Sequence, residues 1–353
     1  MRRLTGLHQA MNARVAVRPK RLMEQFIHNL ELNLTGASVA TETGTGPFTF
    51  SALIACLSGA KQVFTVAPSS QYATHEDLKN GLLYIAEDWG VTSDQLVVVA
   101  SREELPDQID IFLNLGFLRP MDEYLLSKGS SRAVLSYMCE SWEFRPGDLD
   151  MKFCDSRGIP VAGVHENFED FGVFASCGHL ALKLLFEAGV EIAGCNIGIL
   201  SSDPFGTAIC DTLINCNSNP VLIREPKELK ADLVKNLDAL IIASYSESTD
   251  ILSECPLSAT EIANCNPDLK LIQFAGSTNC KDLESAGLTI HPNLQLQPYR
   301  MSKTLSHLGV RPVLALHSLG IKVGELLYRH KAFGTGIPDR FKSLIQPMNK
   351  HIA

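Results

Sequence analysis

The segment Asn196–Glu225, NIGILSSDPFGTAICDTLINCNSNPVLIRE, constrains the fold more than any other part of the chain. An apolar run, a tight turn, a helical pattern and a second apolar run predict a strand, a helix and a parallel strand. Such a unit opens α/β domains in which a glycine turn, G-x-G-x-x-G, brings the backbone close to a pyrophosphate. Here Ser201 and Asp203 stand at the first two glycine positions, and only the third glycine, Gly206, is kept.

The altered turn has a physical interpretation of its own. Asp is a strong N-cap and Pro favours the first helical position, so Asp203 is predicted to cap a helix that begins at Pro204. Its carboxylate would then lie where a phosphate otherwise binds, and it would repel a pyrophosphate. Hydroxyl and N–H donors remain for a less charged ligand. The candidate cofactor contacts of this turn are Ser201, Ser202, Asp203, Phe205 and Gly206.

The end of the second predicted strand carries two further cofactor candidates. Glu225 stands where an acid binds the adenosine ribose in dinucleotide-binding domains. Arg224 beside it could instead favour a 2′-phosphate, so the expected cofactor is NAD or NADP. The alternative is that these are ordinary surface charges, since acidic residues are common after strands.

Composition limits the class of protein. A length of 353 residues suggests two domains, and 45% hydrophobic and 20% charged residues are typical of globular proteins. The net charge of −8 argues against a nucleic-acid partner. Ten scattered cysteines without a Cys-x-x-Cys pair favour reduced thiols in the cytoplasm. No spacing of ligand residues indicates a metal, and no apolar run is long enough for a membrane span.

The first 21 residues are basic and contain no acid. They are consistent with a targeting peptide, a basic arm or a frayed leader.

Strand-like and helical runs alternate along nearly the whole chain. This pattern predicts an α/β fold with two Rossmann-like domains, parallel sheets and an interdomain cleft. We assign residues 1–171 and 311–353 to an N-terminal flavodoxin- or Rossmann-like substrate domain, and residues 172–310 to the nucleotide-binding domain. Helices predicted over 168–187 and from 312 to 328 join the two domains.

The turn Glu42–Gly46, Glu-Thr-Gly-Thr-Gly, follows a predicted strand and precedes a helix. Such a turn can cradle an anion or line a substrate cleft. It is also similar to the E-x-G-x-G turn of methyltransferases, where glycines approach S-adenosylmethionine. A tight turn without a ligand is the alternative. Glu42, Gly44 and Gly46 are therefore candidate substrate contacts.

Polar side chains follow several other predicted strands. In open α/β sheets ligands gather at the carboxyl ends of the strands, so these side chains are candidates for substrate binding. The alternative is a set of surface salt bridges, which contribute little. The candidates are Asn114, Arg119, Trp142 and Arg300.

Three residues at strand ends are candidates for catalysis. His165 can act as an acid or a base near neutral pH, and a neighbouring carboxylate could tune it. Adjacent residues on an extended strand point in opposite directions, so His165 and Glu166 need not touch. The predicted catalytic residues are His165, Glu166 and Glu140.

Residues from about 110 to 330 resemble the D-2-hydroxyacid dehydrogenase superfamily of the formate/glycerate dehydrogenase type. Pro146–Leu185 is similar to the family's "GvDniD…A…rGI.V.N.P……VAE.a..l.L" segment, and Gly198–Ile209 aligns with "GIiGlGrIGqaV". Leu269–Ser277 lies where the family has "g..lIN.aRG". The resemblance implies an NAD(P)-dependent oxidoreductase that acts on a small hydroxy- or oxo-acid-like metabolite, and a homodimer on base rates for the family.

The chain departs from this family at the catalytic positions. The family's arginine would fall near Ala275, but that segment contains no arginine. His291 is the nearest candidate for the family's histidine. Two alternatives to a divergent oxidoreductase therefore stay open: a transferase or lyase on the same scaffold, and a non-catalytic relative that binds a metabolite.

Overall fold

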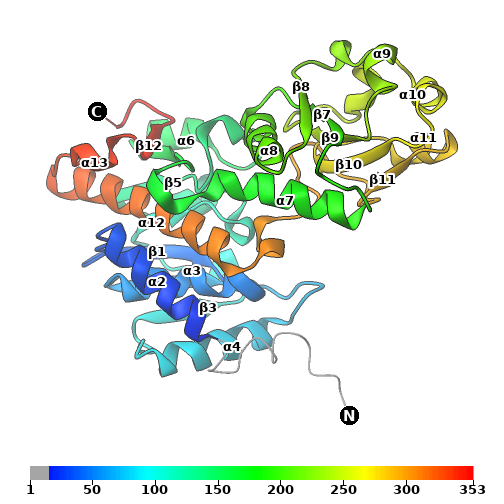
Figure 1. The fold of residues 1–353 in the computed structure, drawn as a ribbon. Coiled ribbons are helices and arrows are strands. Elements are labelled where there is room, and N and C mark those ends of the chain that lie inside the picture. Colours follow the sequence, from blue (N-terminus) through cyan, green and yellow to red (C-terminus); the bar gives the residue numbers. More distant parts are fainter. Residues whose placement is uncertain (1–15, 353) are drawn as a thin grey trace. The chain divides into compact units, whose positions relative to one another are not determined.

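The computed structural model describes residues 16–352 (Figure 1). Arg2, Arg3 and Arg14 of the basic N-terminal segment lie outside the described residues. The chain forms two compact units. Unit 1 comprises Met1–Gly172 and Gly309–Ala353, and unit 2 comprises Val173–Leu308.

The described part of unit 1 contains a seven-stranded sheet in the order β12-β6-β5-β4-β1-β2-β3. All neighbouring strands are parallel except β12, which pairs antiparallel with β6. Strands β1 to β6 follow the order 3-2-1-4-5-6, which is typical of dinucleotide-binding sheets. The strands are β1 Ser38–Glu42, β2 Gln62–Val66, β3 Leu96–Val99, β4 Ile109–Leu113, β5 Gly129–Ser136, β6 Val161–Val164 and β12 Ile345–Pro347.

The longest helix of unit 1, α12, packs on β4, β5 and β6 and against α2 (Figure 1). Two glycines allow this close packing. A Cβ on Gly324 would lie 2.8 Å from Cγ2 of Ile111, and one on Gly320 would lie 2.3 Å from the sulfur of Met138. The helices are α2 Val17–Asn29, α3 Ser51–Leu57, α4 His75–Asp88, α5 Glu123–Ser127, α6 Met151–Ser156, α12 Val310–Phe333 and α13 Asp339–Lys342.

Unit 2 contains a five-stranded parallel sheet in the order β11-β10-β9-β7-β8. Counted from its own first strand, this order is 2-1-3-4-5, the other common doubly wound arrangement. Its strands are β7 Asn196–Leu200, β8 Asn219–Ile223, β9 Ala239–Ala243, β10 Lys270–Ala275 and β11 Thr289–His291. Its helices are α7 Val173–Glu187, α8 Pro204–Asn215, α9 Ala231–Val234, α10 Ala259–Cys265 and α11 Cys280–Ser285.

The structure confirms the predicted α/β class with two Rossmann-like sheets, and it corrects several boundaries. The single helix predicted over residues 168–187 is a 3-10 turn, η5 (Glu169–Phe171), followed by α7, because Gly172 adopts a left-handed conformation with φ +65°. The last residues of the basic N-terminal segment, from Val17 on, belong to helix α2. The apolar face of this helix is buried through Leu22 and Phe26. None of the helices within residues 16–352 has both the length and the apolar character needed to cross a bilayer.

The close packing of α12 on the sheet predicts that a larger side chain at Gly324 will not fit. Gly324→Val should destabilise unit 1 by about 1–3 kcal/mol, because the new side chain collides with Ile111. Chemical denaturation followed by circular dichroism measures this. Gly336→Ala is the control, since an added Cβ there meets nothing within 4 Å. Equal stability of the two variants would contradict the packing argument.

Candidate functional site

The carboxylate of Asp203 holds the turn after β7 in place through two hydrogen bonds. Asp203 is the N-cap of α8, and its Oδ1 accepts a hydrogen bond of 3.0 Å from the backbone N–H of Phe205. Its Oδ2 accepts one of 2.7 Å from the backbone N–H of Tyr245, in the loop after β9. Burial raises the pKa of Asp203, and these N–H donors oppose that shift. The predicted cap is therefore present, and an acid occupies the start of α8.

The glycine that remains in the turn has a packing role. A Cβ on Gly206 would lie 2.7 Å from Cβ of Ser201 and 2.8 Å from Cδ1 of Leu222. The Gly206 N–H donates to Oγ of Ser201 over 3.1 Å, so this hydroxyl is used inside the turn. The ring of Phe205 is buried and packs on those of Phe174 and Phe274, which makes it a core residue of unit 2.

A cavity of about 540 Å³ lies beside this turn. It is lined by the β7–α8 turn, by the end of β8 and by the serine-rich loop after β9. Its place is the point between β7 and β9 where the strand order of unit 2 reverses. Ser201, Ser202 and Arg224 line it together with three acids, Glu247, Asp250 and Glu254.

Four of the predicted cofactor residues, Asp203, Phe205, Gly206 and Glu225, are not among the residues that line this cavity. The side chain of Glu225 is exposed and pairs with Lys227. The side chain of Phe205 faces the interior of unit 2.

Unit 1 brings the three predicted catalytic residues together. Glu140 follows β5, and His165 and Glu166 follow β6, its parallel neighbour. Oε1 of Glu140 accepts a 2.8 Å hydrogen bond from the backbone N–H of Glu166 and lies 3.4 Å from Nδ1 of His165. The His165 side chain is 40% exposed, whereas that of Glu140 is only 7% exposed. A buried carboxylate thus orients an accessible imidazole, an arrangement typical of general acid–base catalysis.

A residue of β12, Gln346, completes this cluster. Its amide N–H donates to Oε2 of Glu140, and its Oε1 accepts a 2.7 Å hydrogen bond from the backbone N–H of Ser141. Sequence reasoning did not single out Gln346, because it lies 206 positions from Glu140 along the chain. Glu143, whose carboxylate accepts from the N–H of Glu140 over 3.3 Å, was also missed, although the Glu-x-x-Glu spacing of a capping box could have indicated it.

Glu166 is the most strongly perturbed acid of the cluster. Burial raises its pKa well above the usual range, and the negative charges of Glu143 and Glu140 raise it further. Burial and the two neighbouring carboxyl groups thus both favour the neutral form of Glu166. Trp142, the other candidate here, is half-buried in the 3-10 turn η4, Ser141–Glu143.

The predicted substrate residues after β1 and β4 also meet. The Glu42 carboxylate accepts a 2.5 Å hydrogen bond from the backbone N–H of Phe117, and burial raises the pKa of Glu42. Arg119 donates to the side chain and the carbonyl of Asn114 over 3.0 and 2.8 Å, and it lies 3.4 Å from Asp148. Arg119 therefore braces the end of β4.

The glycines of the β1 turn differ in their surroundings. Gly46 is exposed, has a φ of +60°, and an added Cβ would meet nothing within 4 Å. Gly44 is buried, and a Cβ there would lie 3.2 Å from Cβ of Phe48.

Arg300 lies beside the end of β10, where the family resemblance expects an arginine. Its carbonyl accepts a 3.0 Å hydrogen bond from the N–H of Gly276, and its neighbour Met301 bridges to Ala275. The nearby His291 lies 3.2 Å from Glu187. Hydrogen bonds from Lys303 and His291 lower the pKa of Glu187 to about 2.

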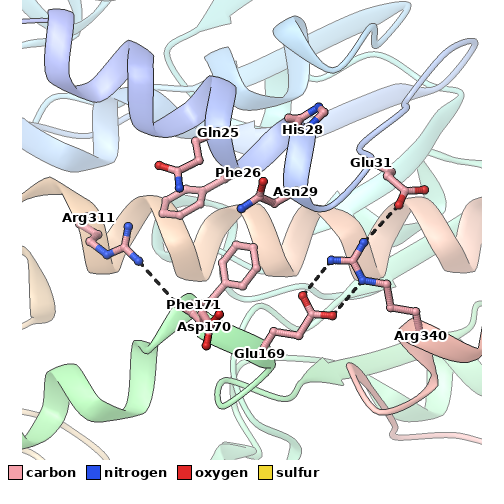
Figure 2. A pocket seen from close by; sticks show the side chains of 10 residues that line it. All are labelled: Gln25, Phe26, His28, Asn29, Glu31, Glu169, Asp170, Phe171, Arg311 and Arg340. Atoms are coloured by element: carbon pink, nitrogen blue, oxygen red, sulfur yellow. Dashed lines mark hydrogen bonds and ion pairs between the residues drawn. The ribbon is translucent and has the colours of Figure 1, made fainter.

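A second cavity, of about 450 Å³, lies between α2, η5, α12 and α13 of unit 1 (Figure 2). Arg340 makes two 2.8 Å hydrogen bonds to Glu169 and one of 3.1 Å to Glu31. Arg311 lies over the ring of Phe26 and donates to the carbonyl of Asp170. Its arginines are thus used to hold these helices together, and we place no functional residue there. Within residues 16–352 no group of His, Cys, Asp and Glu is arranged to hold a metal ion.

Comparison with known proteins gives the fold. No protein-family model and no curated protein sequence matches the chain. A dipicolinate synthase subunit from Bacillus halodurans matches with a TM-score of 0.50 and 13% identity, over 84% of this chain and 99% of that one. The pyruvate reductase of Chlamydomonas reinhardtii matches with a TM-score of 0.50 and 10% identity, over 85% and 97%. The NAD-dependent formate dehydrogenase from Staphylococcus aureus matches with a TM-score of 0.49 and 13% identity, over 89% of this chain and 100% of that one.

The two structures with a TM-score of 0.50 show that the chain shares their fold. The two-domain α/β fold that the sequence resemblance implies is thereby confirmed. At such low identity the likeness extends no further than the fold.

The cluster around Glu166 predicts how stability depends on pH. A pKa raised in the folded state contributes stability at low pH, and this contribution is lost as the pH rises through the folded value. Glu166→Gln mimics the protonated acid, so the variant should lose less thermal stability than the unmodified chain as the pH rises above about 5, where the same acid in the unfolded chain ionises. Melting curves across this range measure the difference. The control is Glu24→Gln, at an exposed position of α2, and parallel curves for all three proteins would contradict the argument.

Proposed function

We propose that this chain is an NAD(P)-dependent oxidoreductase of a small hydroxy- or oxo-acid-like metabolite, with the nucleotide bound in the unit 2 cavity. The observation that carries this proposal is the position of that cavity, at the β7/β9 reversal point of a doubly wound sheet. The pyruvate reductase that shares this fold is, by its name, a reductase of an oxo acid. When bound, NAD(P) would supply or accept a hydride.

The cavity fits the nucleoside end of such a cofactor better than its diphosphate. Hydroxyl groups of Ser202 and Ser246 can bind a ribose, and Arg224 can bind a 2′-phosphate. The first N–H of α8 is already bonded to Asp203, so the helix start does not offer its usual phosphate contact. The proposal therefore places the diphosphate away from Asp203.

The proton that accompanies a hydride is assigned to His165. Reduction of a carbonyl needs a proton donor for the oxygen, and oxidation of the alcohol needs a base. Glu140 at Nδ1 stabilises the imidazolium and leaves Nε2 for the substrate.

A second candidate is a transferase or lyase that needs no dinucleotide. The acids around the unit 2 cavity favour it, because Asp203, Glu247, Asp250 and Glu254 all oppose a diphosphate. The His165–Glu140 pair would serve proton transfer in such an enzyme equally well.

Calorimetric titration with NADH and NADPH tests whether the chain binds a dinucleotide. The variant Asp203→Asn tests whether the carboxylate of Asp203 opposes that binding. The amide oxygen can still accept the N–H of Phe205, although the N–H of Tyr245 loses its acceptor. Because one negative charge is removed, the affinity for both dinucleotides should rise by about five- to tenfold. Asp211→Asn, on the same helix, is the control and should change nothing. If neither the unmodified chain nor Asp203→Asn binds a dinucleotide, the oxidoreductase proposal fails.

Replacement of the proposed acid–base pair tests the chemistry. His165→Asn should lower turnover by about 10²–10⁴-fold. Glu140→Gln should lower turnover less, because the amide still orients the ring of His165 but no longer stabilises the imidazolium. His179→Asn is the matched control, since His179 is exposed on α7. Full turnover of His165→Asn on a substrate found by screening 2-oxo and 2-hydroxy acids would remove His165 from the mechanism.

A further inference from the structure

We propose that Gln346, on the C-terminal strand β12, is a positioning residue for the acid–base pair of unit 1. It holds Glu140 in the carboxylate form and, through Glu140, fixes which ring nitrogen of His165 carries the hydrogen. The inference rests on the acid–base role proposed above for His165 and adds a residue on which that role depends. All the groups involved belong to unit 1.

The segment that carries Gln346 is anchored on both sides of this residue. Before it, the carbonyl of Leu344 accepts a 2.8 Å hydrogen bond from the backbone N–H of His165. After it, the side-chain oxygen of Asn349 accepts one of 3.2 Å from the backbone N–H of Val161. Because these partners stand at the two ends of β6, the backbone of Gln346 is held in place along that strand.

A glycine of β6 lets the loop after β5 come within reach of Gln346. In the antiparallel ladder Gln346 pairs with Gly163. A Cβ on Gly163 would lie 2.7 Å from the backbone nitrogen of Ser141 and 3.0 Å from the carbonyl oxygen of Cys139. The absence of a side chain at this position therefore allows the loop to approach the ladder directly opposite Gln346.

The orientation of the Gln346 amide is fixed by a backbone group. The N–H of Ser141 can only donate, so the Gln346 atom that lies 2.7 Å from it has to be the oxygen, Oε1. The amide nitrogen then faces Oε2 of Glu140 as a donor. Since this nitrogen cannot accept a hydrogen bond, Oε2 of Glu140 has to be an acceptor and does not carry a proton.

The other oxygen of Glu140 is constrained in the same way. Oε1 accepts a 2.8 Å hydrogen bond from the backbone N–H of Glu166, and Nδ1 of His165 lies 3.4 Å from it. With donors facing both oxygens, the network selects the carboxylate form of Glu140. A carboxylate only accepts, so Nδ1 of His165 carries the hydrogen and Nε2 of the neutral ring keeps its lone pair.

Loss of Gln346 would change this assignment. Oε2 of Glu140 would lose its side-chain donor, and the carboxyl group, only 7% exposed, could then take up a proton. A protonated Glu140 can donate to Nδ1 of His165, which moves the hydrogen of the ring to Nε2. Gln346 thus determines that Nε2 is the base, although it acts on His165 only through Glu140.

The test is the long-range ¹H–¹⁵N NMR spectrum of the histidine rings in the ¹⁵N-labelled full chain. At the alkaline limit of the titration, the nitrogen shifts distinguish the two neutral tautomers. The signals of His165 are identified by their loss in His165→Asn. Gln346→Leu removes both side-chain hydrogen bonds of this residue, whereas Gln346→Glu keeps an acceptor for Ser141 and removes the fixed donor to Glu140.

The matched control is Asn349→Leu. It removes a side chain that anchors the same C-terminal segment through Val161, so it reports any effect of loosening that segment as a whole. Melting temperatures show that each variant is folded. The tautomer of the unmodified chain tests the network even where a variant does not fold.

The expected result is an Nδ1–H ring at His165 in the unmodified chain and in Asn349→Leu, and a shift to the Nε2–H ring in each folded Gln346 variant. Three outcomes overturn the proposal: an Nε2–H ring in the unmodified chain, an Nδ1–H ring that persists in every folded Gln346 variant, and an equal shift in Asn349→Leu. Because this readout needs neither cofactor nor substrate, a failure to bind NADH or NADPH would overturn the oxidoreductase proposal and leave the tautomer result standing.

Discussion

The hydrogen bonds of Asp203 determine how unit 2 can hold a ligand. In a glycine-rich turn the backbone donors at the start of the helix are left for a phosphate. Here the carboxylate of Asp203 takes the N–H of Phe205 and reaches across to the N–H of Tyr245. An N-cap of this kind contributes about 1 kcal/mol to helix stability. The turn is therefore organised by the chain itself, without a bound anion.

The remaining glycine shows that the residues of the turn have separable roles. Gly206 is fixed by packing, because any side chain there would collide with Ser201 and Leu222. Ser201 and Asp203 stand where the backbone would otherwise approach a phosphate. Close packing of helix on strand is thus preserved while the phosphate contact is altered. The chain thus keeps the architecture of the unit although other residues stand at the first two glycine positions of the turn.

The features of the fold that could be predicted from the sequence are those that depend on local pattern. The strands, the cap at Asp203 and the polar residues at strand ends follow from short-range signals, and His165 and Glu140 were identified in this way. Their contact depends on β5 and β6 being neighbours, which the alternation of elements implies. The bond from Gln346 to Glu140 could not be predicted, because β12 is too short to show a pattern and pairs across the chain. The break at Gly172 was missed because the apolar helical spacing continues through it.

The two sheets share one arrangement at the points where their strand orders reverse. In unit 1 the carboxylate of Glu42, at the end of β1, binds the N–H of Phe117 after β4. In unit 2 the carboxylate of Asp203, after β7, binds the N–H of Tyr245 after β9. Each bond joins the two diverging strands, and burial raises the pKa of both acids.

This shared arrangement has a consequence for any ligand. An acid that bridges the reversal point occupies a backbone donor and adds negative charge at the place where phosphates bind in related folds. Neutral or cationic groups are favoured at both points, and a phosphate-bearing cofactor has to lie outside the reach of these carboxylates.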